Sequence, residues 1–493
     1  MIDISEVPLD LLRPGAFVFV DPSLAFEGLP VFSQRMVIFG QMFTAGAAAG
    51  TAAPLTFKTI TRDEEADIYF GPGSIAARAA RALRKNNAYH ELHVMGLADD
   101  GAATAATGSI AFTVQATRPG TATFRIAGQR VQIAVKTSDT VTALATKLET
   151  AVNADKQLPV TAVAALGVVT LTARWAGETG NAIDVRYGYF KDGEQPSGLA
   201  VTITAMATGA TNPDVTDAIA AMDALETYDT FVNPYTDTNN LDVLEAELAD
   251  RFTATRAVDG VAFSAFAGTY ANSATLADGR NSPFTQLCLP GLTPTAPWEV
   301  AAAMAGVTTY ADGTEPGRPY QTLALDGVQP PDPGVARFDD QERQLLLTKG
   351  GGTVKVDAGG RVVIERAVTS YKTTASGAAD PSLRDLNTLR LMSYYRRSVV
   401  NTWQRKFPRH KLAGNDQPVN LGQAIMTPAG AKAEMIAHYE KLVSAGLFQD
   451  LAAYKDTILV EIDANQPGRL NIFDRPKPIG QLRQTAMRAA FRL

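Results

Sequence analysis

Side chains that could perform catalysis or bind a metal are few in this sequence. The single cysteine, Cys288, cannot form an internal disulfide or a cysteine-based zinc site. The histidines are His90, His93, His410 and His438. The first two would suit a metal on a helix, but residues 90–95 are typical of a strand, which places the two rings on opposite faces. We therefore predict no metal site and no cofactor.

A glycine motif imitates a dinucleotide-binding loop. Residues 71–76, Gly-Pro-Gly-Ser-Ile-Ala, fit the glycine pattern and precede a helical segment. However, Pro72 lacks one of the backbone N–H groups that would hold phosphate, and the acidic residues 62–67 do not suit a buried parallel strand. We interpret the motif as a helix start with Ser74 near its N-terminus.

Serine hydrolysis is the remaining catalytic hypothesis. A catalytic triad needs a nucleophile, a histidine and an acid, usually with a Gly-x-Ser-x-Gly elbow, and this sequence has no such elbow. Ser264 and Ser273 lie in a predicted strand and a predicted loop, but no histidine lies between His93 and His410. A subtilisin-like serine hydrolase is therefore a distant alternative, and we expect the protein not to be an enzyme.

Length and charge indicate a large protein with one basic region. The 493 residues correspond to roughly three domains at about 150 residues each. The net charge of −6 argues against binding nucleic acid or a membrane surface. From Asp380 onward, 17 Lys/Arg minus 10 Asp/Glu gives +7, which leaves −13 for the remainder. No segment is apolar for long enough to cross a membrane, and residues 1–8 do not look like a secretory signal.

The order of the elements indicates a multidomain fold of the α/β and α+β classes. Strands and helices alternate over 31–100 and again over 206–365, so we predict that these segments form one discontinuous α/β core. Residues 101–205 are rich in Ala, Thr and Gly with short strands and one helix, which predicts an inserted β-rich α+β domain. The Pro-, Gly- and Asp-rich stretch 316–349 predicts long surface loops.

The C-terminal segment 366–480 is predicted to be an α+β domain with two helices. The first would begin at Asp380-Pro381 and end at Phe407, and the second would begin at Thr427-Pro428 and end at Gly446. Basic residues gather on and near these helices, where they either form a solvated face or dock on an acidic protein. They are Arg390, Arg396, Arg397, Arg405, Lys406, Arg409, Lys432 and Lys441.

Two terminal arms carry strands without a predicted partner. The N-terminal arm, 1–30, contains the β run Ala16, Phe17, Val18, Phe19 and Val20. In the C-terminal arm, 481–493, one face of the predicted strand consists of Arg483, Thr485, Met487, Ala489, Phe491 and Leu493. A terminal strand either joins its own sheet or pairs with an edge strand of another subunit.

Several short motifs, taken in order, are informative. They are Arg13-Pro-Gly-Ala-Phe-Val18, Tyr69-Phe-Gly-Pro-Gly-Ser74, Asn181-Ala-Ile-Asp-Val-Arg186, Ile126-Ala-Gly-Gln-Arg-Val131 and Gly177-Glu-Thr-Gly-Asn-Ala-Ile-Asp184. With the terminal helix pair and strand, they make the whole chain resemble the tail sheath proteins of contractile-tailed phages, and the Mu-like group most closely.

The resemblance implies a subtilisin-like core without catalytic apparatus and a structural role. Family sheaths form stacked hexameric rings around a tail tube and contract to drive the tube through the host envelope. It further implies that both arms complete a sheet in a neighbouring subunit and that the C-terminal domain faces the tube. Our tube-facing candidates are Lys432 and Lys441, followed by the arginines of the first helix.

The resemblance also implies partners and a location. The partners would be other copies of this chain, the tail tube protein, and the baseplate and tail terminator proteins, with no direct contact to nucleic acid. The protein would belong to the virion tail and assemble in the host bacterial cytoplasm. Linkers at 21–30 and 475–480 would bend while the exchanged strands stay paired. The nearest alternative is the sheath of a phage-derived bacteriocin or of another contractile injection device.

Overall fold

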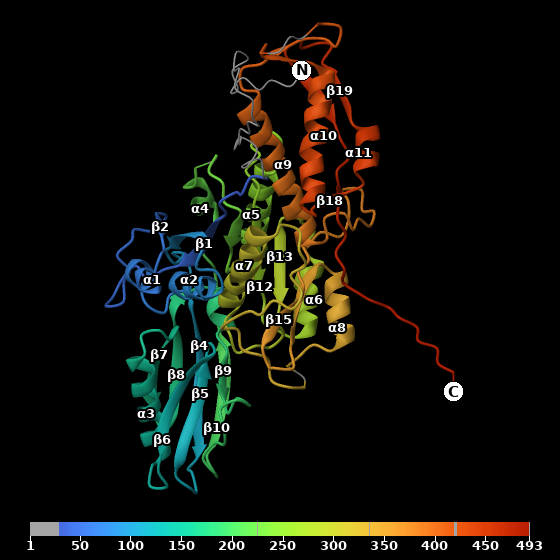
Figure 1. Ribbon diagram of the computed structural model, residues 1–493. Coiled ribbons are helices and arrows are strands. Elements are labelled where there is room, and N and C mark those ends of the chain that lie inside the picture. Colours follow the sequence, from blue (N-terminus) through green and yellow to red (C-terminus); the bar gives the residue numbers. More distant parts are fainter. Residues whose placement is uncertain (1–28, 224, 335, 419–421, 493) are drawn as a thin grey trace, which may run out of the picture. The chain divides into compact units, whose positions relative to one another are not determined.

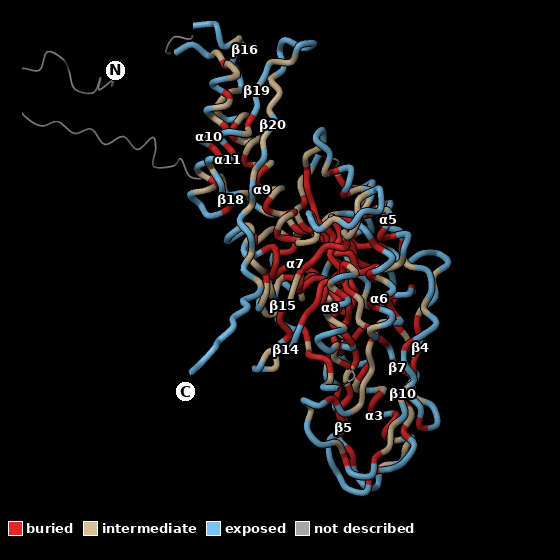
Figure 2. The backbone as a smooth tube through the Cα atoms, turned by 90° about the vertical axis from the view of Figure 1, so that its right-hand side faces the viewer, coloured by how far each residue is buried: buried red, intermediate tan, exposed pale blue. Residues whose placement is uncertain are grey.

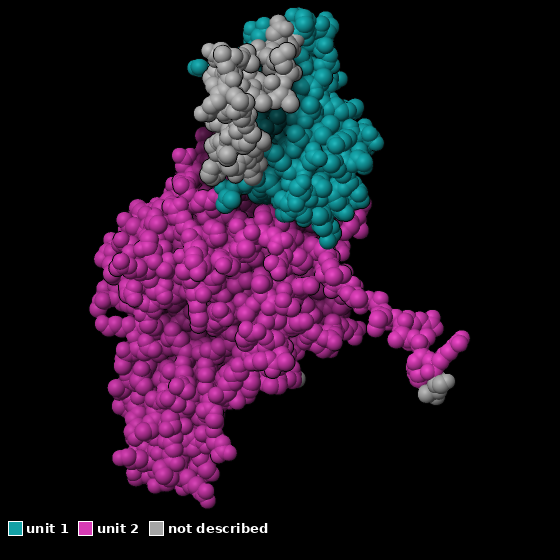
Figure 3. All heavy atoms as spheres, viewed as in Figure 1, with its two compact units in different colours: residues 1–31, 394–480 teal, residues 32–393, 481–493 magenta. Residues whose placement is uncertain are grey.

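The computed structural model describes residues 29–223, 225–334, 336–418 and 422–492. The chain forms two compact units, which Figure 3 colours separately. Within the described residues, unit 1 comprises 29–31 and 394–480, and unit 2 comprises 32–393 and 481–492. The chain therefore passes between the units after Val31, after Ser393 and after Gly480.

Unit 2 is built on an eight-stranded sheet with the order β15-β14-β13-β12-β11-β1-β3-β2. Its six inner strands are parallel, and both edge strands are antiparallel to their neighbours. The inner strands are almost continuously buried, as expected for a parallel sheet covered by helices. The strands are β1 (Arg35–Gln41), β2 (Phe57–Thr59), β3 (Glu91–Leu97), β11 (Thr230–Val232), β12 (Val261–Ala265), β13 (Thr285–Leu289), β14 (Gly351–Val356) and β15 (Val362–Arg366).

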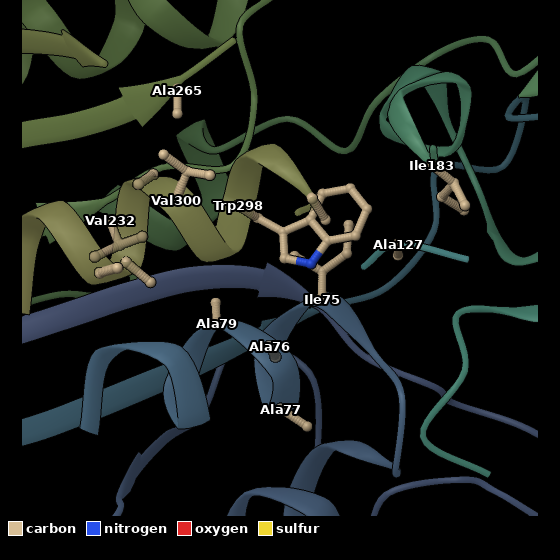
Figure 4. Packing of buried hydrophobic residues seen from close by; sticks show 14 of the residues in the cluster. Ile75, Ala76, Ala77, Ala79, Ala127, Ile183, Val232, Ala265, Trp298 and Val300 are labelled. Atoms are coloured by element: carbon tan, nitrogen blue, oxygen red, sulfur yellow. The ribbon is translucent and has the colours of Figure 1, made fainter. Parts of the chain in front are cut away.

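Helix α7 (Pro297–Thr314) is the central helix of unit 2 and is buried along most of its length. It packs against α2 (Ile75–Asn86), whose N-cap is Ser74, as predicted. Figure 4 shows Trp298 of α7 beside Ile75, with Ala127 and Ile183 of the β-rich segment close by. The remaining helices of unit 2 before Ser393 include α1 (Asp63–Phe70), α4 (Thr216–Ala220), α5 (Thr238–Arg251), α6 (Tyr270–Asp278) and α8 (Asp340–Thr348).

Helix α8 corrects one prediction, because it lies inside the stretch 316–349 that we expected to be surface loops. Its start is a capping box, in which Asp339 and Glu342 each accept a hydrogen bond from the other's backbone N–H. That local signal is visible in the sequence, but the surrounding prolines and glycines obscured it.

The segment between β3 and β11 contains two antiparallel sheets (Figure 1). One has the order β10-β4-β8-β7, and the other has the order β6-β5-β9. The short strands and the helix that the sequence predicts over 101–205 are present in this segment. The elements are β4 (Ala105–Val114), β5 (Gly120–Ile126), β6 (Gln129–Val135), α3 (Val141–Ala154), β7 (Val160–Ala165), β8 (Val168–Ala176), β9 (Val185–Tyr187) and β10 (Ala200–Ala207).

A buried arginine fastens this β-rich segment to the core. Arg78 of α2 donates to the carbonyl oxygens of Gln157 (2.9 Å) and Ala127 (3.0 Å), both in the β-rich segment. Its Nε lies 2.7 Å from the carboxylate of Glu299 on α7. Trp175 of β8 also makes an edge-to-face contact with Trp298, with ring centroids 5.4 Å apart. The Arg78 side chain thus joins two helices of the core to two loops of the β-rich segment.

Helix α9 (Leu386–Lys406) begins in unit 2 and continues in unit 1. The predicted first helical residue, Pro381, lies five residues before the observed one, Leu386. The Asp380 carboxylate accepts a hydrogen bond from the backbone N–H of Ser382, and Thr369 pairs through its N–H with the carbonyl of Arg384. Because 380–385 is held against the segment 367–372 that follows β15, the helix forms only afterwards.

Unit 1 has a small core and three two-stranded sheets. Helix α10 begins after Thr427 and ends at Ser444, which confirms the predicted second helix. Tyr439 and Tyr454 stack with centroids 3.7 Å apart, and Tyr395 and Phe448 pack beside them. The elements are β16 (Lys411–Leu412), β17 (Ile425–Met426), α10 (Pro428–Ser444), β18 (Phe448–Gln449), α11 (Leu451–Thr457), β19 (Leu459–Ile462), β20 (Leu470–Phe473) and β21 (Lys477–Pro478).

Candidate assembly surfaces

The two predicted arms differ in what the structure describes. The N-terminal run of Ala16, Phe17, Val18, Phe19 and Val20 lies outside the described residues, as does Leu493. Donation of the N-terminal strand therefore stays a prediction.

The C-terminal arm forms no sheet within its own chain over the described residues 481–492. Its side chains from Gln484 onward are exposed, and the exposed fractions of Met487 and Phe491 are 86% and 85% (Figure 2). Thr485, Met487, Ala489 and Phe491 alternate with polar or small residues, so in an extended conformation they share one face. The arm thus presents an apolar strand face to solvent.

The root of the arm, Gln481 to Arg483, is attached to unit 2. The Gln481 side chain donates to the Gly317 carbonyl (3.1 Å), and the Gln321 side chain donates to the Leu482 carbonyl (3.3 Å). Arg483 forms an ion pair with Asp385 and lines a cavity of about 350 Å³. Arg483 therefore binds its own chain here, although we predicted it as part of the arm strand.

Asp385 connects the arm root to an edge strand of unit 2. Its carboxylate accepts hydrogen bonds from Arg366 of β15 (3.0 and 3.1 Å) and also pairs with Arg483. Burial raises the pKa of Asp385, but the two guanidinium groups outweigh it, so the pKa lies below its ordinary value. The carboxylate stays ionised and holds both arginines.

The antiparallel pair β19 and β20 in unit 1 is an incomplete sheet. Leu459 and Phe473 face each other across the two strands, and their exposed fractions are 64% and 53%. An isolated two-stranded sheet is marginally stable in water. Its two outer edges have no neighbouring strand among the described residues. This ribbon is therefore a candidate acceptor for an added strand.

The linker expected at 475–480 is largely fixed to unit 1. Lys477 and Pro478 pair with β18, and the Lys477 N–H donates to the Tyr439 hydroxyl (3.0 Å). Ile479 donates its N–H to the Leu447 carbonyl (3.1 Å). The bending that we expected over 475–480 is therefore restricted, because Lys477, Pro478 and Ile479 are hydrogen-bonded to unit 1.

The candidate lysines of α10 lie on different sides of that helix. Its buried stripe consists of Ala431, Met435, His438, Tyr439 and Leu442. Lys432 and Lys441 are nine positions apart, which is two and a half turns, so they flank the stripe on opposite sides. Both are half-buried. One flat partner surface could not contact both side chains equally.

The basic residues of α9 fall into three classes. Arg390 lies within unit 2 and donates to Asp312 and to the Thr230 hydroxyl, each at 2.8 Å. Its side chain is 9% exposed, so this placement removes Arg390 from the outward-facing candidates. Lys406 pairs with Glu434 of α10 at 2.7 Å. Arg405 is exposed, and Arg396 and Arg397 are half-buried.

Comparison with known proteins identifies the family to which this chain belongs. Three domain families match the chain: the phage tail sheath protein β-sandwich domain over residues 99–211, the phage tail sheath protein central domain over 208–370, and the phage tail sheath C-terminal domain over 378–492. The Mu-like prophage FluMu tail sheath protein of Haemophilus influenzae is 35% identical over 483 residues, which cover 98% of each chain. The chain belongs to the Mu-like phage tail sheath family.

One solved structure supports this assignment at the level of the fold, and a second is a weaker match. A sheath tail protein from Desulfitobacterium hafniense matches with a TM-score of 0.50 and 12% identity, covering 95% of this chain and 97% of that chain. A sheath tail protein from Listeria innocua matches with a TM-score of 0.48 and 15% identity, covering 92% and 94%. Membership of the family, shown by the matching domains and by the Haemophilus influenzae relative, makes the sheath protein a structural component of a phage tail.

The catalytic candidates occupy structural positions in the sheath protein. The Ser264 hydroxyl is fully buried and donates to the Asn233 carbonyl (2.9 Å), and Ser273 is buried in α6. His438 is buried between two hydroxyls, with Ser398 at 3.0 Å and Thr402 at 3.2 Å from its ring nitrogens. Burial lowers the pKa of His438, so the ring stays neutral.

His93, one of the two histidines considered for a metal site from the sequence, also has contacts within the protein. His93 of β3 contacts the Tyr228 hydroxyl (3.0 Å) and Glu91 (2.9 Å) through its two ring nitrogens. Among the described residues, no group of three or more His, Cys, Asp or Glu side chains could hold a metal ion. Within the same residues, no helix is both long and apolar enough to cross a lipid bilayer.

Proposed function

We propose that the sheath protein polymerises as stacked hexameric rings around a tail tube and contracts to drive that tube through the host envelope for genome delivery. The observation that carries the proposal is that the described chain holds both an exposed C-terminal segment with alternating apolar side chains and a two-stranded sheet whose edges have no neighbouring strand among the described residues. A donor segment and an acceptor edge that pair between different copies can join copies without limit.

Strand addition is the physical basis of the lattice. The arm from Thr485 onward would pair with the β19–β20 ribbon of a neighbouring copy, where Met487 and Phe491 could cover Leu459 and Phe473. Main-chain hydrogen bonds would supply affinity, and the alternating apolar side chains would set the register. The N-terminal run Ala16 to Val20 is the second proposed donor.

Contraction then requires subunit bodies that move rigidly and stay joined by hydrogen bonds that last through the movement. Exchanged strands keep their hydrogen bonds while the bodies rotate, because the motion is absorbed where each arm leaves its unit. The densely packed unit 2 suits a rigid body. We propose that basic residues of unit 1, with Lys432 as first candidate and Arg405 as second, contact the tube in the extended state. New contacts between the acidic core domains would drive contraction.

The finer assignments belong to the same proposal. The discontinuous core over 31–100 and 206–365 would be a non-catalytic relative of the subtilisin fold, with 101–205 inserted and 366–480 facing the tube. Baseplate and terminator proteins would bind the ends of the sheath. Assembly would take place in the cytoplasm of the host bacterium, before release of the virion.

The test is a truncation that removes residues 485–493 and retains the arm root. We expect the purified wild-type protein to sediment as hollow tubes with a helical repeat in electron micrographs. The truncated protein should remain in the supernatant while keeping its thermal unfolding midpoint, because the described part of the removed segment, 485–492, is exposed. Tubes of normal length from the truncated protein would refute strand donation by this arm.

A further inference from the structure

The C-terminal arm follows unit 1 in sequence but is attached to unit 2. In unit 1, the last residue held by a backbone hydrogen bond is Ile479, which donates to Leu447. In unit 2, the first attached residue is Gln481, whose side chain donates to Gly317. Gly480 alone separates the two attachments, and a side chain added there would meet no atom within 4 Å. Gly480 is therefore the point at which the chain can bend.

Three consecutive residues hold the arm root by different means. Gln481 uses its side chain, Leu482 uses its backbone carbonyl, and Arg483 uses its guanidinium. Burial lowers the pKa of the Arg483 guanidinium, while Asp385 opposes that effect. A guanidinium that has left water for a carboxylate costs free energy when it is separated from it again. The root is consequently a clamp rather than a loose contact.

The position of the acceptor carboxylate adds to the argument. Asp385 also binds Arg366 of β15 and directly precedes α9, the helix that leads into unit 1. The outgoing helix and the returning arm are therefore attached to unit 2 at one residue. Beyond Gln484 the described residues of the arm, 485–492, are exposed throughout.

We propose that residues 481–483 clamp the arm to unit 2, so that unit 2 carries the donated strand and only 485–493 are available to a second copy of this chain. The identity of the recipient rests on the proposed function, whereas the clamp does not. Nine extended residues reach about 30 Å, which limits the recipient to an adjacent copy.

The clamp also sets the effective concentration of the donor strand. If it opened, the free segment would begin at Gly480 and grow from nine to fourteen residues. Local concentration falls with about the −3/2 power of length, so the strand would meet its acceptor about twofold less often. The clamp thus favours one neighbour by keeping the arm short.

Site-directed spin labels on the full-length, unassembled protein test the clamp without relying on assembly. Cys288 is buried, and burial raises its pKa to about 12, so the native thiol does not compete for the label. Labels are placed singly at L482C, inside the root, and at M487C, in the free arm. We expect an immobilised spectrum at 482 and a fast, nearly isotropic spectrum at 487.

Two variants then decide what causes the immobilisation. The double substitution Q481A/R483Q should make the label at 482 as mobile as the label at 487. The control R488Q removes the same charge from the free arm and should leave the label at 482 immobilised. A mobile label at 482 in the wild-type background, or one that stays immobilised in Q481A/R483Q, would overturn the clamp.

Failure of the clamp and failure of strand donation are distinguishable. The label spectra report only on the single chain, so they keep their meaning if the 485–493 truncation still forms tubes. If the labels behave as expected but the truncated protein still forms tubes, the clamp is retained, and donation of the arm to a second copy is rejected. Mobile labels together with loss of tubes on truncation would instead reject the clamp and retain donation.

Discussion

Units 1 and 2 differ in how completely the backbone hydrogen-bonding groups of their strands are paired within the unit. Unit 2 contains an eight-stranded sheet whose inner strands are buried under helices, and the outer side of its edge strand β15 is hydrogen-bonded to residues 322–325. Unit 1 contains three two-stranded sheets with strands of two to four residues. The first arrangement is stable by itself, whereas the second leaves hydrogen-bonding capacity for another chain. If the proposed strand donation is correct, folding depends mainly on unit 2 and assembly on the short sheets of unit 1.

The ion pairs of the two units follow the same division. In unit 2, Arg78 and Arg390 are almost fully buried and face buried carboxylates. In unit 1, the pairs Lys406–Glu434 and Lys477–Asp450 are partly or largely exposed. Loss of a buried partner leaves an uncompensated charge, while loss of an exposed partner is compensated by water.

The largest effect should come from Arg78→Met in unit 2. The substitution leaves the Glu299 carboxylate and two carbonyl oxygens of the β-rich segment without their donor, which should cost about 3–5 kcal/mol of unfolding free energy. Hydrogen exchange of peptides from α2 and α7 in the unassembled protein would measure this loss. Exchange rates unchanged from wild type would contradict the role of Arg78.

The second effect concerns pH and unit 1. Because burial lowers the pKa of His438, the unfolded chain takes up a proton at a higher pH than the folded unit does. The stabilisation is therefore complete above the ordinary histidine pKa of about 6.5 and is lost as pH falls through the lower folded value. Hydrogen exchange of α9 and α10 peptides should accelerate as the pH is lowered from 7 to 5, after correction for intrinsic rates.

The substitution His438→Gln removes the titrating group and should flatten that pH dependence. His410→Gln, at an exposed position, is the matched control and should keep the wild-type profile. The readout must be resolved by unit, because burial also lowers the pKa of His90 in unit 2. A profile in His438→Gln that remains as steep as in wild type would refute the assignment.

A smaller effect separates the two lysines of α10. Since Lys432 and Lys441 lie on opposite sides of the helix, we expect charge reversal to weaken binding to the tube protein more strongly at one of them than at the other. Lys432→Glu should cost about 1 kcal/mol per subunit contact, and Lys441→Glu should cost less. Co-sedimentation of sheath and tube protein over a range of concentrations measures both. Equal losses would show that the tube does not lie along one side of α10.

The smallest effect should follow Lys406→Met in unit 1. Its pair with Glu434 is about one-third exposed on the lysine side, so removing it should cost no more than about 0.5 kcal/mol. Denaturant unfolding gives the value, and the same substitution at Arg78 provides the contrast. A loss from Lys406→Met as large as that from Arg78→Met would remove the distinction between the units.

The sequence by itself determined the features that depend on neighbouring residues. Thr427-Pro428 starts α10 because both residues act within one turn, and the Gln129 and Val160 strands follow from local alternation. The change of composition near residue 101, the basic C-terminal region and the alternating arm are equally local. Together with the short motifs, these features were sufficient to indicate a tail sheath protein.

Only the tertiary structure decided which charged residues are available to partners. Arg390 and Arg405 are both basic residues of α9. Arg390 is almost fully buried and pairs with Asp312, which lies 78 residues away in the sequence, so no local pattern could indicate this partner. Arg483 likewise pairs with Asp385, which lies 98 residues away in the sequence, and this pair attaches the arm root to unit 2. Local sequence sets what a segment can form, whereas burial and ion pairing depend on long-range packing.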